Sequence, residues 1–181
     1  MSIFMSMFSM RKGRNRMSGF TLIELLVVIA IIGVLASIVL ASLNSARKKS
    51  RDARRITDIK QIQLALELYF DSQGSTYPPS GACDATHSFG LEVLATNNYI
   101  PQVSRDPSNT AKCYAYGAPT TAPRVTYHLG ASLEEASNPA LAGDKNQAAT
   151  SGWLNDFNGA NVSGTPCIAG DPGLVCYDIV P

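Results

Sequence analysis

The sequence predicts an α+β protein, in which one long N-terminal helix packs on a small antiparallel β-sheet head. Two observations support this fold class. Residues 25–43 form a long apolar run close to the N-terminus, and the chain after Ser75 is rich in turn residues with short β-prone segments between them. The apolar run predicts a membrane-spanning half of the helix, and the segment that follows predicts an amphipathic half.

The apolar run contains no charged side chain, and only Gly33, Ser37 and Ser42 interrupt its alanines and large aliphatic residues. At ~1.5 Å per residue, a helix of this length crosses most of a hydrocarbon layer of about 30 Å. One carboxylate, Glu24, stands at the start of the run. Because a charge at a membrane segment costs a few kcal/mol on insertion scales, Glu24 is expected to have a partner.

Basic residues flank the run on both sides. The leader has four, with no acid before Glu24: Arg11, Lys12, Arg14 and Arg16. Six more follow the run: Arg47, Lys48, Lys49, Arg51, Arg54 and Arg55. The raw count would place the C-terminal side in the cytoplasm, but long domains cross membranes largely regardless of charge. Because the four cysteines also lie beyond the run, we expect the N-terminus inside and the head outside.

The helix is expected to continue from Phe20 to Phe70 and to end at Gly74 and the Tyr77-Pro78-Pro79 stop. Its apolar side chains recur at spacings of three and four, which is typical of one buried face. That face comprises Ile56, Ile59, Ile62, Leu66 and Tyr69 or Phe70, and is widened by Leu64 and Leu68. The basic turns at 47–55 fit either a collar in solvent or at lipid headgroups, or salt bridges between subunits.

The remainder predicts a short helix at 91–97 and three strands at 112–116, 124–129 and 175–180. A three-stranded antiparallel sheet packed on the apolar helix face is the simplest architecture. The domain boundaries that follow are a leader peptide at 1–19, a transmembrane and assembly helix at 20–43, its amphipathic continuation at 44–74, and a globular β-rich head at 75–181.

The four cysteines, Cys83, Cys113, Cys167 and Cys176, are an even set and predict two disulfides in an exported head. Of the three possible pairings we favour Cys167–Cys176, which closes a short loop, together with Cys83–Cys113. A zinc site is the competing interpretation, but the paired Cys-x-x-Cys spacing that would make it specific is missing.

Catalysis has no support in the sequence, and we predict no catalytic and no cofactor-binding residue. Neither His87 nor His128 lies in a catalytic or metal motif, and the chain has no glycine-rich phosphate loop and no Gly-x-Ser-x-Gly elbow. Residues 71–181 hold ten acidic and four basic side chains, which argues against a nucleic-acid-binding head.

The N-terminal segment resembles the class III signal of type IV pilins and type II secretion pseudopilins. The resemblance rests on the basic leader, on the apolar run, and on the motif Gly19-Phe20-Thr21-Leu22-Ile23-Glu24 between them. It implies cleavage between Gly19 and Phe20, N-methylation of Phe20, a pilin-like lollipop fold, and pairing of Glu24 with the α-amino group of a neighbouring subunit's Phe20. An ordinary signal anchor or a cleaved secretory signal is the alternative. A secretory signal would have an apolar region of ~7–15 residues and a small-residue cleavage site. Here the run is longer, Glu24 interrupts its start, and no convincing cleavage site follows.

The resemblance implies a structural subunit of a type IV pilus or a type II secretion pseudopilus. The expected partners are the prepilin peptidase, copies of the chain and other pilins, the inner-membrane assembly platform, and the lipid bilayer before assembly. The protein would lie in the cytoplasmic membrane and then in a pilus or pseudopilus at the cell surface. The alternative is a membrane-tethered minor pilin or binding module that captures DNA or a surface ligand.

Calcium is a further expectation from the resemblance, because major secretion pseudopilins often bind it in a loop near the C-terminus. Oxygen donors suited to calcium stand in the corresponding part of the chain at Asp144, Asp156, Asn158 and Asp171. Their spacing matches no ligand motif, so solvated loop acids are the competing interpretation.

Overall fold

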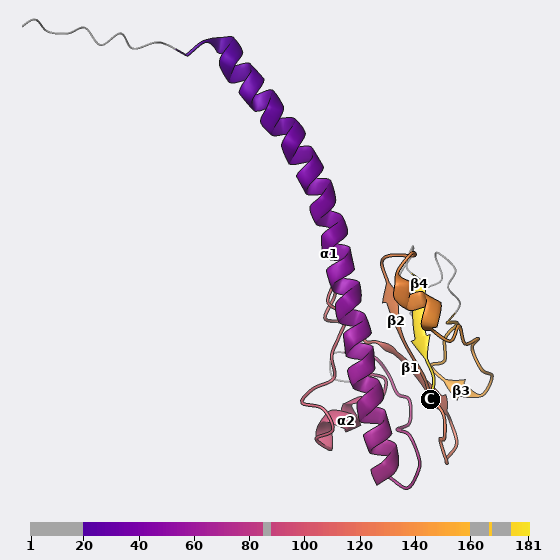
Figure 1. Cartoon of the computed structure of the whole chain (residues 1–181). Coiled ribbons are helices and arrows are strands. Elements are labelled where there is room, and N and C mark those ends of the chain that lie inside the picture. The colour runs from indigo at the N-terminus through magenta and orange to yellow at the C-terminus, as the bar shows by residue number, and fades with distance from the viewer. Residues whose placement is uncertain (1–19, 85–87, 160–166, 168–174) are drawn as a thin grey trace, which may run out of the picture. The chain divides into compact units, whose positions relative to one another are not determined.

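A computed structural model describes residues 20–84, 88–159, 167 and 175–181 (Figure 1). It contains one long helix, a short helix, a 3-10 turn and a small antiparallel sheet, so the predicted α+β class is confirmed. The chain divides into two compact units between Ser42 and Leu43.

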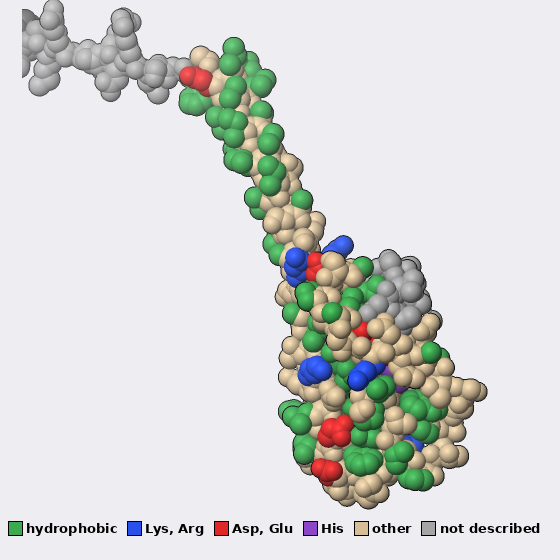
Figure 2. Space-filling model, turned by 45° about the vertical axis from the view of Figure 1, so that its right-hand side comes forward, with side chains coloured by type: hydrophobic (Ala, Val, Ile, Leu, Met, Phe, Trp, Pro, Cys, Tyr) green, Lys and Arg blue, Asp and Glu red, His purple; other side chains and the backbone are tan. Residues whose placement is uncertain are grey.

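The long helix α1 spans Leu22–Ser72, close to the expected 20–70. In the first unit its large apolar side chains lie in the open, with exposed fractions of 45–80% from Phe20 to Leu40. The green surface of this part of α1 in Figure 2 shows the same feature. With a mean hydropathy of 3.0 over its most apolar stretch, α1 is long and apolar enough to cross a membrane.

In the second unit α1 buries one face against the head. Ile59, Ile62 and Leu66 are at most 1% exposed, which confirms the predicted apolar face. Leu64 and Leu68 do not widen it, because they are 64% and 46% exposed. Each follows a buried residue by two positions, which in a helix is about 200° of rotation and places the side chain on the far side.

The end of α1 follows the expected glycine stop. Gly74 adopts a positive φ of 67°, and the amide of Ser75 donates to the carbonyl oxygen of Phe70 at 3.0 Å. This is the Schellman arrangement, in which a left-handed residue reverses the chain and satisfies a carbonyl in the last turn.

The sheet has the order β3-β1-β2-β4, with all neighbouring strands antiparallel. Its strands are β1 Ala115–Pro119, β2 His128–Leu133, β3 Trp153–Leu154 and β4 Val175–Ile179. The third predicted strand is therefore almost exact, whereas the first two lie three and four residues too early, and β3 was missed. Helix α2 spans Glu92–Thr96, within the expected 91–97, and the 3-10 turn η1 spans Pro139–Gly143.

The two faces of the sheet differ in what covers them. One face packs on the head part of α1 through alternating residues such as Tyr116, Leu129 and Tyr177. The opposite face carries His128 and Asp178 and a small second cluster of Ala115, Phe157, Cys167 and Cys176. Gly130 lies beneath this cluster, and a Cβ there would stand 2.8 Å from the Phe157 ring and from Cys167 Sγ.

Two disulfides cross-link segments within the head. They join Cys83 to Cys113 and Cys167 to Cys176, which are 30 and 9 residues apart in sequence. This is the pairing that the sequence favoured, and it leaves none of the four cysteines for a zinc site.

Candidate functional site: the N-terminal segment and the ion-pair network of the helix

The start of α1 is closed by a reciprocal cap that sequence reasoning missed. Oγ1 of Thr21 accepts a hydrogen bond from the Glu24 amide at 3.2 Å, and a Glu24 carboxylate oxygen accepts from the Thr21 amide at 2.8 Å. The Thr21 hydroxyl donates to the same oxygen at 2.7 Å. This is the capping box, for which threonine three residues before glutamate is the sequence signal.

The cap gives Glu24 a partner within its own chain. The hydrogen bonds to Thr21 are exposed, so the carboxylate remains accessible to another group. Phe20 is also in the open, at 76% exposure, while Gly19 and the leader lie outside the described residues. The part of the predicted processing motif that the structure describes begins at Phe20. It consists of this exposed phenylalanine followed by the capped start of α1.

Arg55 is the centre of a buried ion-pair network in the second unit. Its side chain is 1% exposed, and its guanidinium contacts three carboxylates. Nε and Nη2 donate to the two oxygens of Asp106 at 2.7 and 3.0 Å. Nη1 donates to Asp52 at 2.7 Å and to Glu134 at 2.8 Å. Such a planar fork suits carboxylates better than the point charge of a lysine.

The carboxylates of this network bind the backbone and a second arginine as well. Asp52 accepts from the amides of Glu134 and Glu135 at 3.0–3.1 Å, which attaches the end of β2 to α1. Arg51 donates to both oxygens of Glu134 at 2.6 Å. The network thus joins α1, the loop around Asp106 and the end of β2 through fully hydrogen-bonded charges, which is the condition under which buried ions are tolerated.

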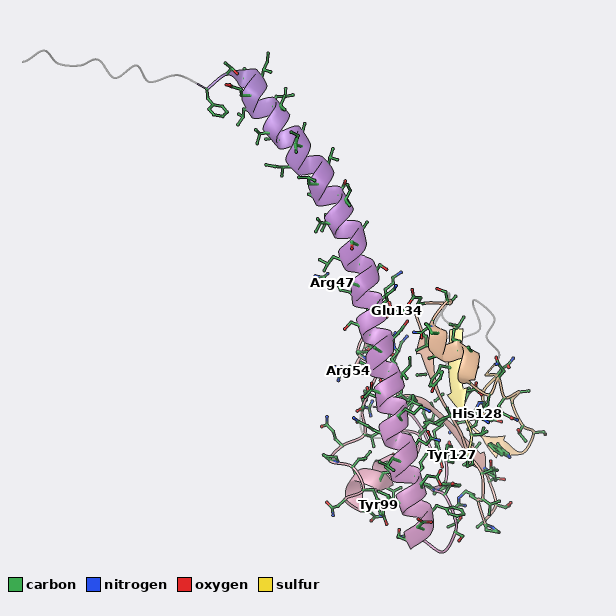
Figure 3. All side chains as sticks on the ribbon, in the orientation of Figure 1. Arg47, Arg54, Tyr99, Tyr127, His128 and Glu134 are labelled. Carbon is green, nitrogen blue, oxygen red and sulfur yellow. A yellow bond between two sulfur atoms is a disulfide. The ribbon has the colours of Figure 1, made fainter. Side chains whose placement is uncertain are left out.

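Four of the six basic residues in these turns of α1 therefore have a role that neither sequence alternative included, because their charges pair within one chain. Besides Arg51 and Arg55, Lys49 lies 3.6 Å from Glu135 and Arg54 lies 3.8 Å from Asp58. Figure 3 labels Arg47 and Arg54 on this part of α1, and Glu134 just after β2. Asp106 and Glu134 are 51 and 79 residues away from Arg55, so no local spacing could have revealed them.

The network shifts the pKa values of its members. Burial alone would raise the pKa of Asp106, but hydrogen bonds from Arg55 and Ser108 outweigh it and hold that pKa below its usual value. Hydrogen bonding from Arg51 is the largest influence on Glu134 and lowers its pKa too, against a smaller opposing effect of burial. Burial would lower the pKa of Arg55, yet its carboxylate partners raise it. The arginine and both carboxylates are therefore charged at neutral pH.

Two of the residues expected to bind calcium, Asp144 and Asp156, bind other groups of the protein in the described part of the chain. Asp156 binds the ring of His128, and the amides of Thr150 and Phe157 donate to the same carboxylate. Asp144 accepts from the Asn146 side chain, Asn158 is exposed, and Asp171 lies outside the described residues. Within the described part of the chain, no group of three or more His, Cys, Asp or Glu side chains is placed to hold a metal ion.

An exposed phenylalanine, a capped apolar helix and a head folded on the second half of that helix define the class of the protein. These features are those of pilin-like proteins with a prepilin-type N-terminus. In agreement, residues 14–40 match the family model described as the prokaryotic N-terminal methylation motif. The resemblance stated from the sequence is thereby confirmed.

Comparison with characterised proteins narrows the class to one family. The chain is 32% identical over 156 residues to type II secretion system core protein G of Pseudomonas aeruginosa, covering 78% of this chain and 99% of that protein. It is 32% identical to the protein of the same name from Vibrio cholerae serotype O1, covering 53% of this chain and 68% of the relative. For the relative from Aeromonas hydrophila the identity is 41%, over 52% of this chain and 69% of that protein.

The chain therefore belongs to the family of type II secretion system core protein G. No solved structure matches the chain significantly, so the identification rests on the sequence relatives and on the N-terminal motif.

Proposed function

We propose that this chain is a structural, non-catalytic subunit of a type II secretion pseudopilus, processed after Gly19 and polymerised through its N-terminal helix. The observation that carries the proposal is the capped apolar part of α1, whose large side chains are exposed and therefore require lipid before assembly and other helices after it. Membership of the core protein G family supports a pseudopilus rather than a pilus or a competence fibre.

The orientation and partners follow from this proposal. The chain would be a single-pass protein of the cytoplasmic membrane with its head outside, where the two disulfides can persist. A prepilin peptidase would remove residues 1–19 and methylate Phe20. Copies of the chain and related pseudopilins would then leave the bilayer for the filament with the help of an inner-membrane assembly platform.

Glu24 has two states in this scheme. In the isolated chain its carboxylate is bound by Thr21, as the structure describes. In the filament it would exchange this local partner for the α-amino group of Phe20 in a neighbouring subunit. An exposed capping interaction contributes only about 0.5–2 kcal/mol, so a charge pair formed away from water can replace it.

Processing is the first test of this function. The intact mass and N-terminal sequence of the chain recovered from its own membrane or surface fraction are expected to begin at N-methylated Phe20. A chain that retains its leader, or one cut beyond Leu43, would refute assembly through the prepilin pathway.

The role of Glu24 is tested separately with two substitutions. Glu24→Gln keeps an oxygen that can accept from Thr21 but removes the charge, whereas Glu24→Ala removes both. We expect both variants to insert into the membrane normally, resisting alkaline extraction, and to yield at least about tenfold fewer sedimentable filaments. Ser37→Ala, which removes a hydroxyl that donates a hydrogen bond to the Val34 carbonyl of its own helix, is the matched control. Normal assembly of Glu24→Gln would show that the charge has no part in assembly.

The alternative, a tethered module that captures DNA or a surface ligand, has no specific support in the described part of the head. The acidic balance of residues 71–181 argues against DNA as the ligand.

A further inference from the structure

Two leucines in the head part of α1 are exposed on the side of the helix that faces away from the sheet. Leu64 and Leu68 are 64% and 46% exposed, whereas Leu66 between them is buried. Single exposed leucines are common on protein surfaces and need no explanation. These two, however, are four residues apart in a helix, so they lie one turn above the other and form a single apolar ridge.

A groove lies on each side of this ridge. The first has a volume of about 330 Å³ and is formed by the ridge with residues 99–101, which follow α2. Tyr99, labelled in Figure 3, lines it, and none of its described lining residues is charged. The second has a volume of about 370 Å³ and is bordered by Leu64, Lys60 and Glu67. A ridge between two grooves is the surface shape that packs against the side chains of another helix.

The ridge continues as an uncharged path along α1 toward the apolar run. Residues 46–68 contain ten charged side chains, but none of them stands on this path. The exposed residues of the path precede Leu64 at spacings of three, four and seven: Ala46, Ser50, Ala53 and Thr57. At about 100° per residue, the path and the ridge lie within about 60° of one another around the helix. In the sequence, a further step of seven residues leads back to Val39 in the apolar run.

The residues of the path are suited to contact with a helix rather than with lipid. The ten charges of residues 46–68 keep this part of α1 out of a hydrocarbon layer. Alanine, serine and threonine side chains let a second helix approach closely, because the distance between helix axes depends on the side chains at the contact. The Thr57 hydroxyl donates to the carbonyl oxygen of Ala53 at 2.9 Å, so it already has a partner when the path is covered.

The chain itself supplies a helix that fits this surface. From Phe20 to Leu43 the large apolar side chains of α1 are 41–80% exposed. In a filament assembled through α1, these side chains must be covered by other copies, since an exposed apolar surface of this length is unfavourable in water. Aliphatic side chains are also the groups that an uncharged groove beside two leucines accepts best.

We propose that the ridge of Leu64 and Leu68, with its grooves and the uncharged path, is covered in the filament by the apolar part of α1 of a second copy. The inference rests on the proposed polymerisation through α1 and adds to it a contact surface within the head. Leu64 and Leu68 are contact residues between copies, which explains why they are exposed in the single chain.

The partner is identified by site-directed photocrosslinking in filaments of the full chain, produced in its own cells. We expect benzoylphenylalanine at position 64 to give a dimer of the processed chain, in which mass spectrometry finds the crosslink within residues 22–43 of the second copy. The same probe at Val125, which is 59% exposed in the loop before β2, is the control and should not crosslink to residues 22–43. A probe at position 64 that gives no dimer, or that crosslinks to another region or another protein, would overturn the proposal.

A substitution tests whether the ridge is needed for assembly. We expect Leu64→Lys to give at least about tenfold fewer sedimentable filaments, because it would bury an unpaired charge between two copies. Leu64→Met should assemble normally, since it keeps an apolar side chain of similar volume. Val125→Lys is the matched control for adding a charge at an exposed apolar position, and it should also assemble normally. Membrane insertion, leader removal and thermal unfolding, followed by the fluorescence of the only tryptophan, Trp153, should be unchanged in all three variants.

The unsubstituted chain is the reference for both experiments. If it is not processed after Gly19 or forms no filaments, the proposed function is wrong and the contact surface is refuted with it. If it forms filaments and Leu64→Lys forms as many, the proposed function stands and only the contact surface is refuted.

Discussion

Arg55 shows how one buried residue can connect three parts of a small head. Its guanidinium contacts Asp52 on the same helix, Asp106 in a loop and Glu134 at the end of β2. Arg55, Asp52 and Asp106 are charged and buried, and Glu134 is partly buried, so the loss of the arginine leaves buried carboxylates without compensation. Residues of this kind are expected to be much more sensitive to substitution than the exposed basic residues beside them.

The first prediction concerns this sensitivity. Arg55→Met retains most of the aliphatic stem but leaves Asp52 and Asp106 buried without their cation, and we expect it to destabilise the head by about 3–5 kcal/mol. Arg54→Met is the matched control at the preceding position, where the side chain is 64% exposed, and should cost less than about 1 kcal/mol. Denaturant unfolding in detergent, followed by Trp153 fluorescence, measures both. Equal losses in the two variants would show that the network does not stabilise the fold.

The second prediction concerns pH. The pKa values of Asp106 and Glu134 are lowered in the folded protein, so their contribution is present above the unfolded pKa values of about 3.9 and 4.3. It is lost as the pH falls through the folded values, because the folded state must then take up protons at a cost. We expect the free energy of unfolding to be nearly constant from pH 7 to about pH 5 and to decrease at pH values below about 4.

Asp106→Asn supplies the control for this pH dependence. The asparagine cannot titrate, so the variant should be less stable at neutral pH and should lose less stability on acidification. An acid slope as steep as that of the unsubstituted chain would mean that other carboxylates cause the loss.

The elements of the head are packed closely where their sequences contain small residues. Gly130 in β2 and Gly117 in β1 lie beneath the segment that follows β3. A Cβ at Gly130 would stand 2.8 Å from the Phe157 ring, and a Cβ at Gly117 would stand 2.9 Å from Cα of Asp156. Glycine is unfavourable in strands, and these two residues weakened the sequence signal for β1 and β2. Their presence is explained by the close approach of the covering segment.

The third prediction follows from this close approach. Gly130→Ala introduces a methyl group into the Cys167 and Phe157 contacts, and we expect a loss of about 1–3 kcal/mol from overpacking. Gly143→Ala is the control, because a Cβ there would have no atom of the described residues within 4 Å. The difference in Tm between the two variants measures the effect. A Gly130→Ala protein as stable as Gly143→Ala would show that the covering segment can move away without cost.

At the scale of the whole molecule, the head depends on cross-links as well as on its core. About a hundred residues beyond α1 provide one small core, which in exported proteins is commonly supplemented by disulfides. Cys83–Cys113 attaches the chain after α1 to the segment that leads into β1. Its 30-residue separation makes it the longer of the two covalent loops.

The fourth prediction concerns this bond. In the chain-entropy description, a loop of 30 residues contributes about 3–4 kcal/mol by restricting the unfolded state. We therefore expect the double substitution Cys83→Ser with Cys113→Ser to lower stability by about that amount, measured by denaturant unfolding without reductant. Adding reductant to the variant should then have a smaller effect than adding it to the unsubstituted chain. Equal stability of variant and parent would exclude this contribution.

The sequence by itself determined the N-terminal half of this protein and the fold class of the rest. The apolar run and the buried stripe of Ile59, Ile62 and Leu66 are local patterns, so a hydropathy profile and a helix period are enough to recognise them. The processing motif is also local, and it was recognised by its resemblance to the signal of a known family. The positions of β1 and β2, the exposure of Leu64 and the existence of β3 were decided by the tertiary structure.

The polar sites were also decided only by the tertiary structure. Arg55 binds Asp106 and Glu134, and His128 binds Asp156 and Asp178. The partners are 28 to 79 residues apart in the sequence. Such pairs leave no periodic signal in the sequence. Any carboxylate of the head could have been the partner, and only the folded chain determines which ones are brought to the buried cation. The same burial makes the chosen partners specific, since a charge removed from water must be met by the groups that the fold places beside it.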